Sequence, residues 1–294
     1  MSFADLHLHT KFSDGTYTPE ELVAQAKFHK LTAIALTDHD TVEGCARAAA
    51  VCAAAKIEFI PGSELTSEHA DVEVHILAYF VDTRNAELLA EMAKFQTVRQ
   101  NRIREMCAAL NQLGVGLQAA DVFALANCQS PGRPHVARAL VAGKFCRSLD
   151  EAFERFLKKD RPAYVPKFKM SCPHAIELIH RAGGLAVMAH PALNRNDDII
   201  PSVVEAGLDG IEVFHTKHGP PANKRYMDIA KKHGLLVTGG SDCHGMSKGR
   251  PLIGTVKLDY SYVEKMKERY ANNLSSANSA NFREDDKTKT IRVN

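Results

Sequence analysis

The stretch Ala33–His39, AIALTDH, is a short apolar run that ends in an acid and a histidine. A helical pattern follows it over Glu43–Lys56, and a second apolar run follows over Glu58–Thr66. Short apolar runs that alternate with helical patterns are typical of parallel strands joined by crossover helices. The stretch therefore predicts a strand–helix–strand unit of an α/β fold.

Similar apolar runs recur along the chain. They are Ala4–His9, Ala33–His39, Glu58–Thr66, Asp71–Phe80, Gly184–Pro191, Gly210–Thr216 and Leu235–His244. Helical patterns separate most of them, such as Thr18–Lys30, where Thr18 is the expected N-cap, Pro19 the first helical residue and Glu21 the third. Strands in this number predict a closed or distorted barrel, with an open doubly wound sheet as the alternative.

The composition is that of an ordinary globular protein. The chain has 294 residues, of which 45% are hydrophobic and 24% are charged. This composition excludes an intrinsically disordered, a collagen-like or a disulfide-rich protein. The net charge of +2 does not by itself point to a nucleic-acid partner, and it is compatible with a local basic face. An odd number of cysteines, no CxxC motif and no signal peptide predict reduced thiols in the cytoplasm, and no apolar segment is long enough for a membrane helix.

One long segment breaks the alternation. Residues 83–168 contain no convincing strand, and apolar residues recur there at helical spacing from Leu88 to Leu113. From Arg84 to Lys169 the chain has 15 basic and 8 acidic residues, a charge of +7 against −5 for the remainder. We expect a barrel over 1–82 and 169–262, a helical insertion that caps the substrate over 83–168, and a disordered or loosely attached tail over 271–294.

Histidines and acids gather at or near the ends of the apolar runs. Because residues two apart on a strand share a face, His7 and His9 form one pair and Asp242 and His244 another. The full set of candidate metal ligands is His7, His9, Asp14, His39, Glu64, His75, His190, Asp242 and His244. A single His or Asp after a strand is more often a cap or turn residue, but so many at one sheet edge favour a metal centre.

The donor types narrow the choice of metal. Imidazole and carboxylate without thiolate suit Mn, Fe, Zn or Co, and Cys243 is expected to point away from its neighbours Asp242 and His244. These side chains are too many for one ion, so we expect two or three divalent ions, with manganese favoured and Glu64 as the natural bridge. Such a cluster binds a phosphoryl group and lowers the pKa of a bridging water.

Five motifs in order, HLHTKFSDG, TDHD, the Glu of PGSE, AHP and SDCH, resemble the PHP (polymerase and histidinol phosphatase) family. The resemblance spans residues 7–244 and implies a distorted (β/α)7 barrel with a trinuclear site for phosphoester hydrolysis. It implies that His7, His9, Glu64 and Asp242 hold one ion. Glu64, His75 and His190 would hold a second, and Asp14, His39 and His244 a third.

Three further segments, RQNRIREM, SPGRPHVARAL and YVPKF, resemble the branch that contains the 3′,5′-nucleoside bisphosphate phosphatase and the 5′→3′ exonucleases that trim short RNA. A substrate with two phosphates needs an Arg-rich site away from the metals. Asn101, Arg104, Arg133 and His135 are the predicted ligands of the distal phosphate or sugar. Arg99 falls on an apolar helical stripe, which a snorkelling side chain also explains.

Two further residues are candidates for catalysis. His215, at the end of another strand, is either a proton donor to the leaving oxygen or a loop histidine held by hydrogen bonds. Arg250 is expected to reach the phosphate.

The predicted activity is removal of the 3′-phosphate from 3′,5′-bisphosphonucleotides such as adenosine 3′,5′-bisphosphate, with a short-RNA exonuclease and a histidinol phosphate phosphatase as alternatives. A nucleotide or short RNA is the expected partner, with no membrane or protein partner.

Overall fold

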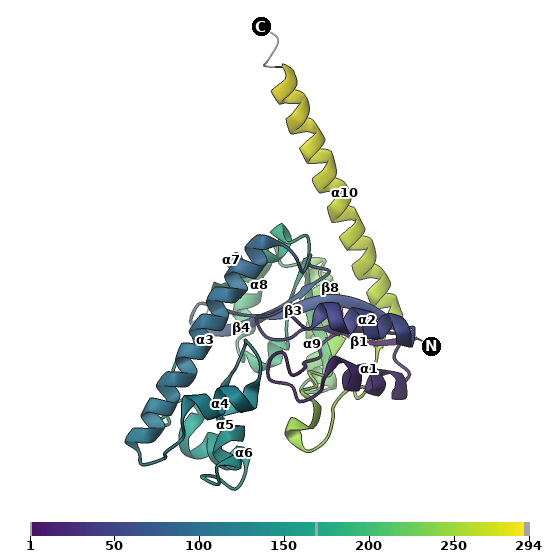
Figure 1. The fold of residues 1–294 in the computed structure, drawn as a ribbon. Coiled ribbons are helices and arrows are strands. Elements are labelled where there is room, and N and C mark those ends of the chain that lie inside the picture. The colour runs from purple at the N-terminus through teal and green to yellow at the C-terminus, as the bar shows by residue number, and fades with distance from the viewer. Residues whose placement is uncertain (1, 168–169, 291–294) are drawn as a thin grey trace.

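A single sheet forms the centre of the molecule (Figure 1). The computed structural model describes residues 2–167 and 170–290. The strands are β1 (Phe3–Asp5), β2 (Ala33–Leu36), β3 (Glu58–His69), β4 (Val72–Tyr79), β5 (Met170–Ser171), β6 (Leu185–Met188), β7 (Gly210–His215), β8 (Leu236–Gly240) and β9 (Leu258–Asp259). They follow the order β8-β7-β6-β4-β3-β2-β1-β9, and β5 pairs with β3. Strand β4 runs antiparallel to β3 and β6, whereas β1–β3 and β6–β8 form parallel pairs.

The sheet curls until β1 meets β8. The Leu6 N–H donates to the Gly239 carbonyl over 3.1 Å, and Leu8 forms an isolated bridge with Cys243. Gly240 allows this approach, because a Cβ at that position would lie 2.4 Å from the backbone nitrogen of His7. The distorted (β/α)7 barrel predicted from the sequence is thus confirmed, and the open doubly wound alternative is wrong.

Crossover helices cover the barrel as the sequence predicts. They are α1 (Pro19–Phe28), α2 (Cys45–Ala55), α7 (Cys172–Arg181), α8 (Ile200–Glu205) and α9 (Pro220–His233), with short 3-10 turns at Pro191–Leu193, Asp197–Ile199 and Gly245–Lys248. Helix α1 begins with a capping box, in which the Thr18 hydroxyl accepts from the Glu21 N–H and the Glu21 carboxylate accepts from the Thr18 N–H.

The segment between β4 and β5 is helical, and within its described residues 83–167 it contains no strand. It holds α3 (Ala86–Gln112), α4 (Ala119–Ala126), α5 (Arg133–Ala142), α6 (Leu149–Ala152) and a π-helical turn, η1 (Phe153–Leu157). The first turns of α3 pack on the barrel core, whereas Ile103, Met106 and Leu110 pack in a second apolar core among these helices. We call α4, α5, α6 and η1 the cap helices. That these helices cover the bound substrate remains a prediction.

A buried ion pair ties α3 to the barrel. The Arg99 Nε donates to the Asp40 carboxylate over 2.8 Å, and the same guanidinium donates to the Thr66 hydroxyl over 3.3 Å. Arg99 is therefore a buried, paired charge and not a snorkelling side chain. Because Asp40 directly follows His39, the pair connects the helical segment to a loop that carries a candidate metal ligand.

The C-terminal part of the chain differs from expectation. Helix α10 (Tyr260–Thr290) packs Val263 and Met266 against the barrel and then extends away from it (Figure 1). The tail, expected to be disordered or loosely attached, is helical as far as Thr290, and 291–294 lie outside the described residues. The stretch lacks the apolar periodicity of a packed helix, but its Ala, Arg, Glu and Lys residues favour helix without packing. Among the described residues, no helix is both long and apolar enough to cross a bilayer.

Candidate metal centre and adjoining cavity

The nine candidate metal ligands meet at one end of the barrel. His7 and His9 follow β1, His39 follows β2, His190 follows β6, and Asp242 and His244 follow β8. Asp14 lies in the loop before α1, whereas Glu64 and His75 lie within β3 and β4. His190, Asp242 and Asp40 adopt left-handed backbone conformations, with φ of 28°, 53° and 49°. Such conformations are uncommon outside glycine and cluster at functional sites.

Glu64 is the central group. Its carboxylate lies between 2.6 and 3.3 Å from imidazole nitrogens of His7, His9, His39, His75 and His190. The side chain is 1% exposed. A carboxylate that faces imidazoles on several sides has the geometry of a bridge between ions, as the sequence predicts for Glu64.

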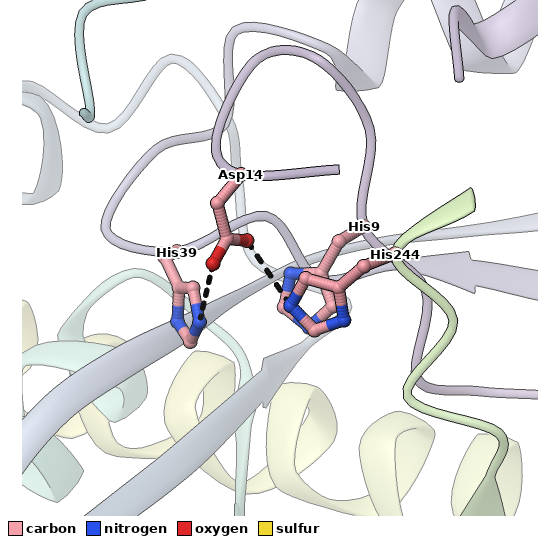
Figure 2. Close-up of side chains that lie close together, drawn as sticks. All are labelled: His9, Asp14, His39 and His244. Atoms are coloured by element: carbon pink, nitrogen blue, oxygen red, sulfur yellow. Dashed lines mark ion pairs between the residues drawn. The ribbon is translucent and has the colours of Figure 1, made fainter. Parts of the chain in front are cut away.

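Asp14 organises a second group (Figure 2). The His244 Nε2 lies 3.1 Å from one Asp14 oxygen, and the His39 Nε2 lies 4.0 Å from the other. The rings of His9 and His244 are stacked with centroids 4.2 Å apart. These four residues can present ligand atoms within 4.8 Å of one another. His9 thus joins the set of Asp14, His39 and His244 that the resemblance implies.

Asp242 organises a third group. Its Oδ1 lies 3.3 Å from the His9 Nε2 and 3.6 Å from the His7 Nε2. The ligand atoms of these three residues also lie within 4.8 Å of one another. His7 and His9 therefore lie between two carboxylates, Glu64 and Asp242, which is the arrangement implied for the first ion.

The carboxylates of this cluster are held as anions. Burial raises the pKa of Glu64, but His39, His75 and His7 outweigh it and hold the pKa well below its ordinary value. The same balance, burial against neighbouring imidazoles, holds the pKa values of Asp14 and Asp242 well below the ordinary range. Burial lowers the pKa values of His7 and His9, but the neighbouring carboxylates outweigh it, raising the pKa of His7 well above its ordinary value and that of His9 to about 10. These imidazoles would therefore release a proton on binding a metal, since the neutral ring is the ligand.

Several donor atoms of the cluster have no hydrogen-bond partner among the described residues. They are both ring nitrogens of His9, Asp14 Oδ1, His39 Nδ1 and His190 Nδ1, all buried. Buried polar atoms without a partner are costly, and coordination to a cation satisfies them. The residues present therefore fit divalent ions. Cys243 packs in the apolar core, and its Sγ accepts from the Gly245 N–H over 3.4 Å, in line with its exclusion as a ligand.

Sequence reasoning missed Glu212. This fully buried side chain in β7 lies 3.1 Å from the His7 Nδ1 and accepts from the His190 N–H over 2.8 Å. It therefore orients the His7 ring and holds the backbone of His190 in its left-handed conformation. The signal was present, because Glu212 is the one acid in the apolar run GIEVFH and needs a buried partner.

A cavity of about 650 Å³ adjoins the centre. Asp14 and His244 line one part of it, and Pro134 and Arg138 of α5 line another. The remaining wall is formed by Ser148, Leu149, Asp150, Phe153 and Ser247. Arg138, which lies five residues beyond the predicted Arg133 on the same helix, donates to the Asp14 carbonyl. It was missed because the sequence does not show which face of α5 meets the cavity.

The four predicted substrate ligands lie elsewhere than on the wall of this cavity. Arg104 donates to the Asn101 side chain over 2.8 Å and lies over the Phe123 ring. Arg133 donates to the Leu157 carbonyl over 3.4 Å. His135 is buried, its Nδ1 accepts from the Gly132 N–H, and burial lowers its pKa to about 4. A neutral His135 at pH 7 supplies no positive charge for a phosphate.

His215 and Arg250 lie beside the centre, around another cavity. The His215 Nε2 lies 3.6 Å from Asp242, and its Nδ1 accepts from the Lys217 N–H over 3.1 Å. The Nε2 therefore carries the hydrogen when the ring is neutral. Both residues line a second cavity of about 540 Å³, together with Lys217 and Lys257.

Comparison with known proteins agrees with this geometry. A family model described as "PHP domain" matches residues 5–159. The chain is 33% identical to a 3′,5′-nucleoside bisphosphate phosphatase of Chromobacterium violaceum, over 86% of this chain and 91% of that protein. It is 31% identical to a 5′-3′ exoribonuclease of Escherichia coli, over 82% of this chain and 84% of that protein.

A solved structure from Bifidobacterium adolescentis, of a protein assigned as a metal-dependent phosphoesterase, has the same architecture. It aligns with a TM-score of 0.83 and 34% sequence identity, covering 90% of this chain and 94% of the other. The barrel, the cluster of imidazoles and carboxylates and these similarities agree, and the chain belongs to the PHP family of metal-dependent phosphoesterases.

Proposed function

We propose that this protein removes the 3′-phosphate from 3′,5′-bisphosphonucleotides, of which adenosine 3′,5′-bisphosphate is the example. The observation that carries the proposal is the cluster of nine imidazoles and carboxylates that opens, through Asp14 and His244, into a cavity with a cationic side chain, Arg138. The similarity to a bisphosphate phosphatase supports it. The reduced thiols expected from the sequence support a location in the cytoplasm.

The ligand groups suggest how two or three divalent ions, with manganese as the expected metal, would be held. His7, His9, Glu64 and Asp242 form one group, and Glu64 with His75 and His190 a second. Asp14, His39 and His244 form the third. Such ions would polarise the phosphoryl oxygens and activate water for attack on phosphorus. The task of the protein is to place the terminal phosphate there and to exclude substrates that lack a second anion.

His215 is proposed to donate a hydrogen bond from Nε2 to the departing ribose oxygen, which takes its proton from water. Its Nε2 is buried, has no hydrogen-bond partner among the described residues and lies near Asp242. The Lys217 N–H at Nδ1 favours the tautomer with the hydrogen on Nε2. Arg250, exposed on the neighbouring cavity, is proposed to contact the phosphate from that side.

Arg138 is the proposed partner of the distal phosphate. It lines the cavity that contains Asp14 and His244, so a substrate bound at those ligands and extending into the cavity passes its guanidinium. Arg133 at the start of the same helix remains a further candidate. The helical segment 83–168 would then act as the substrate cap, as its charge suggests.

Replacing Arg138 with alanine is expected to raise KM for adenosine 3′,5′-bisphosphate about tenfold or more, because hydrogen bonds to charged groups contribute roughly 1.5–3 kcal/mol. The matched control is Arg104→Ala, since Arg104 is exposed on α3 and lies over Phe123. A KM for Arg138→Ala equal to that of the unmodified protein would contradict the role of Arg138, and a raised KM for Arg104→Ala would instead support the ligand that the sequence predicts. Bound metal is measured in both variants, because Arg138 also donates to the loop that carries Asp14.

The proposed activity is tested with a panel of phosphoesters on the manganese-loaded protein. Adenosine 3′,5′-bisphosphate should have the highest kcat/KM, above 3′-AMP, 5′-AMP and histidinol phosphate, and the product should be 5′-AMP. Rapid hydrolysis of histidinol phosphate, with adenosine 3′,5′-bisphosphate and 5′-AMP turned over equally poorly, would overturn the assignment to this branch.

A 5′→3′ exoribonuclease on short RNA is the second candidate, supported by the similarity to the Escherichia coli enzyme. The same ligands would serve it. An end-labelled RNA ladder separates the two activities, because stepwise shortening requires cleavage of phosphodiesters, which a phosphatase of mononucleotides does not perform.

A further inference from the structure

The cavity beside Asp14 and His244 changes character along its length. The metal ligands and Arg138 make one end strongly polar. At the other end, α6 and the π-helical turn contribute Leu149 and Phe153, both half-buried, and Pro134 of α5 adds a third apolar side chain. The exposed Ser148 and Asp150 flank Leu149 at the same end. A volume of about 650 Å³ is within the range of small-molecule sites. Its shape and polarity match a ligand with an anionic end and a flat apolar end.

Phe153 has a second unusual feature. It is the first residue of the π-helical turn Phe153–Leu157, in which the Lys158 N–H donates to the Phe153 carbonyl over 3.0 Å. Turns of this kind are rare, widen the helix locally and are frequent at functional sites. Phe156 and Leu157 of the same turn are buried in the core of the cap helices, whereas Phe153 stays half-exposed on the cavity.

We propose that this apolar end binds the nucleobase of the substrate and that the base stacks on the ring of Phe153. The inference rests on the proposed function, since it names the part of a nucleotide that lies away from the metal centre. With the terminal phosphate at Asp14 and His244 and the distal phosphate at Arg138, the base reaches Leu149 and Phe153. Aromatic stacking accepts any base, because every base has a π-face.

The neighbouring cavity around Arg250 is less suited to this role. Its charged lining consists of Lys217, Arg250 and Lys257, with no carboxylate among the described residues that form its wall. Phe214, Leu252 and Val256 also line it, but the three cations beside them favour a phosphate over a base. The two cavities therefore differ in the ligand chemistry they offer, and the one between α5 and α6 fits the nucleobase.

The test uses the absence of tryptophan from the chain. Phe153→Trp places the single tryptophan of the chain at the proposed stacking position, where it can be excited selectively, and keeps an aromatic ring there. Adenosine 5′-monophosphate, the expected product, should quench its fluorescence in a saturable way without turnover. A tetrahydrofuran 5′-phosphate, which lacks the base, should not. The matched control is Phe145→Trp, since Phe145 is an exposed aromatic residue of the same segment outside the cavity wall.

A kinetic experiment complements the binding measurement. In the unmodified enzyme, kcat/KM should favour adenosine 3′,5′-bisphosphate over the abasic 3′,5′-bisphosphate, and Phe153→Ala should reduce this ratio on the order of 5- to 100-fold. Phe153→Tyr and Phe153→Trp should preserve the ratio, and Phe145→Ala should leave it unchanged.

The outcomes separate the inference from the proposed function. Lack of quenching in Phe153→Trp, equal quenching in Phe145→Trp, or an unchanged ratio in Phe153→Ala would overturn the nucleobase site. If the unmodified enzyme hydrolyses neither bisphosphate, the proposed function fails, and quenching of Phe153→Trp by adenosine 5′-monophosphate still decides whether the cavity binds a base.

Discussion

Replacing Glu64 with glutamine should lower kcat/KM for phosphoester hydrolysis about a thousandfold, equivalent to roughly 4 kcal/mol of transition-state stabilisation. The reason is the position of Glu64 among the imidazoles of His7, His9, His39, His75 and His190. Glutamine keeps the size of the side chain but removes its charge and one of its two acceptor oxygens, so it cannot bridge two cations.

Metal content and kinetics are measured together for this variant. Bound metal, determined by elemental analysis, should fall by at least one ion per chain, and added manganese should not restore activity. The control is Glu58→Gln, at the other end of the same strand, where Glu58 accepts from Lys267 and lies away from the cluster. Unchanged metal content with kcat/KM within threefold of the unmodified enzyme would exclude Glu64 as a bridging ligand.

The position of His75 shows how far the pattern of strand ends could predict the site. Most of the ligands follow parallel strands, whose carboxyl ends share one edge of a sheet, so their convergence could be expected from the order of apolar runs. His75 instead lies within β4, which is antiparallel, and it reaches the cluster because it pairs with Thr66, two residues beyond Glu64. Strand direction depends on tertiary pairing that local sequence does not encode.

The substrate side of the site was harder to predict for a related reason. The sequence places Arg133, His135 and Arg138 on one short helix, but the face of α5 that meets the cavity is set by its packing against α4 and α6. Packing turns His135 inward, where burial keeps it neutral, and leaves Arg138 on the cavity. Charge and spacing point to the segment that lines the cavity, whereas the structure was needed to show that Arg138, and not Arg133 or His135, lies on the cavity wall.

Replacing Glu212 with glutamine should weaken manganese binding about 10- to 100-fold, the usual effect of losing a partner that orients a metal ligand. The two carboxylate oxygens of Glu212 accept from two donors, the His7 ring at 3.1 Å and the His190 N–H at 2.8 Å. Glutamine offers one acceptor, and its amide group would face a second donor, so one of the two hydrogen bonds is lost.

The response to added metal distinguishes this positioning role from that of a direct ligand. For Glu212→Gln, equilibrium dialysis should give a higher Kd for manganese, and saturating manganese should bring kcat back to within a few-fold of the unmodified enzyme, whereas Glu64→Gln should stay inactive. The exposed Glu205→Gln in α8 is the matched control and should leave the Kd unchanged. If Glu212→Gln bound manganese normally, the geometry of His7 and His190 would have to be fixed by other contacts. If it lost an ion that excess manganese could not replace, Glu212 would itself be a ligand, together with His7 and His215, whose ligand atoms lie close enough to share a cation.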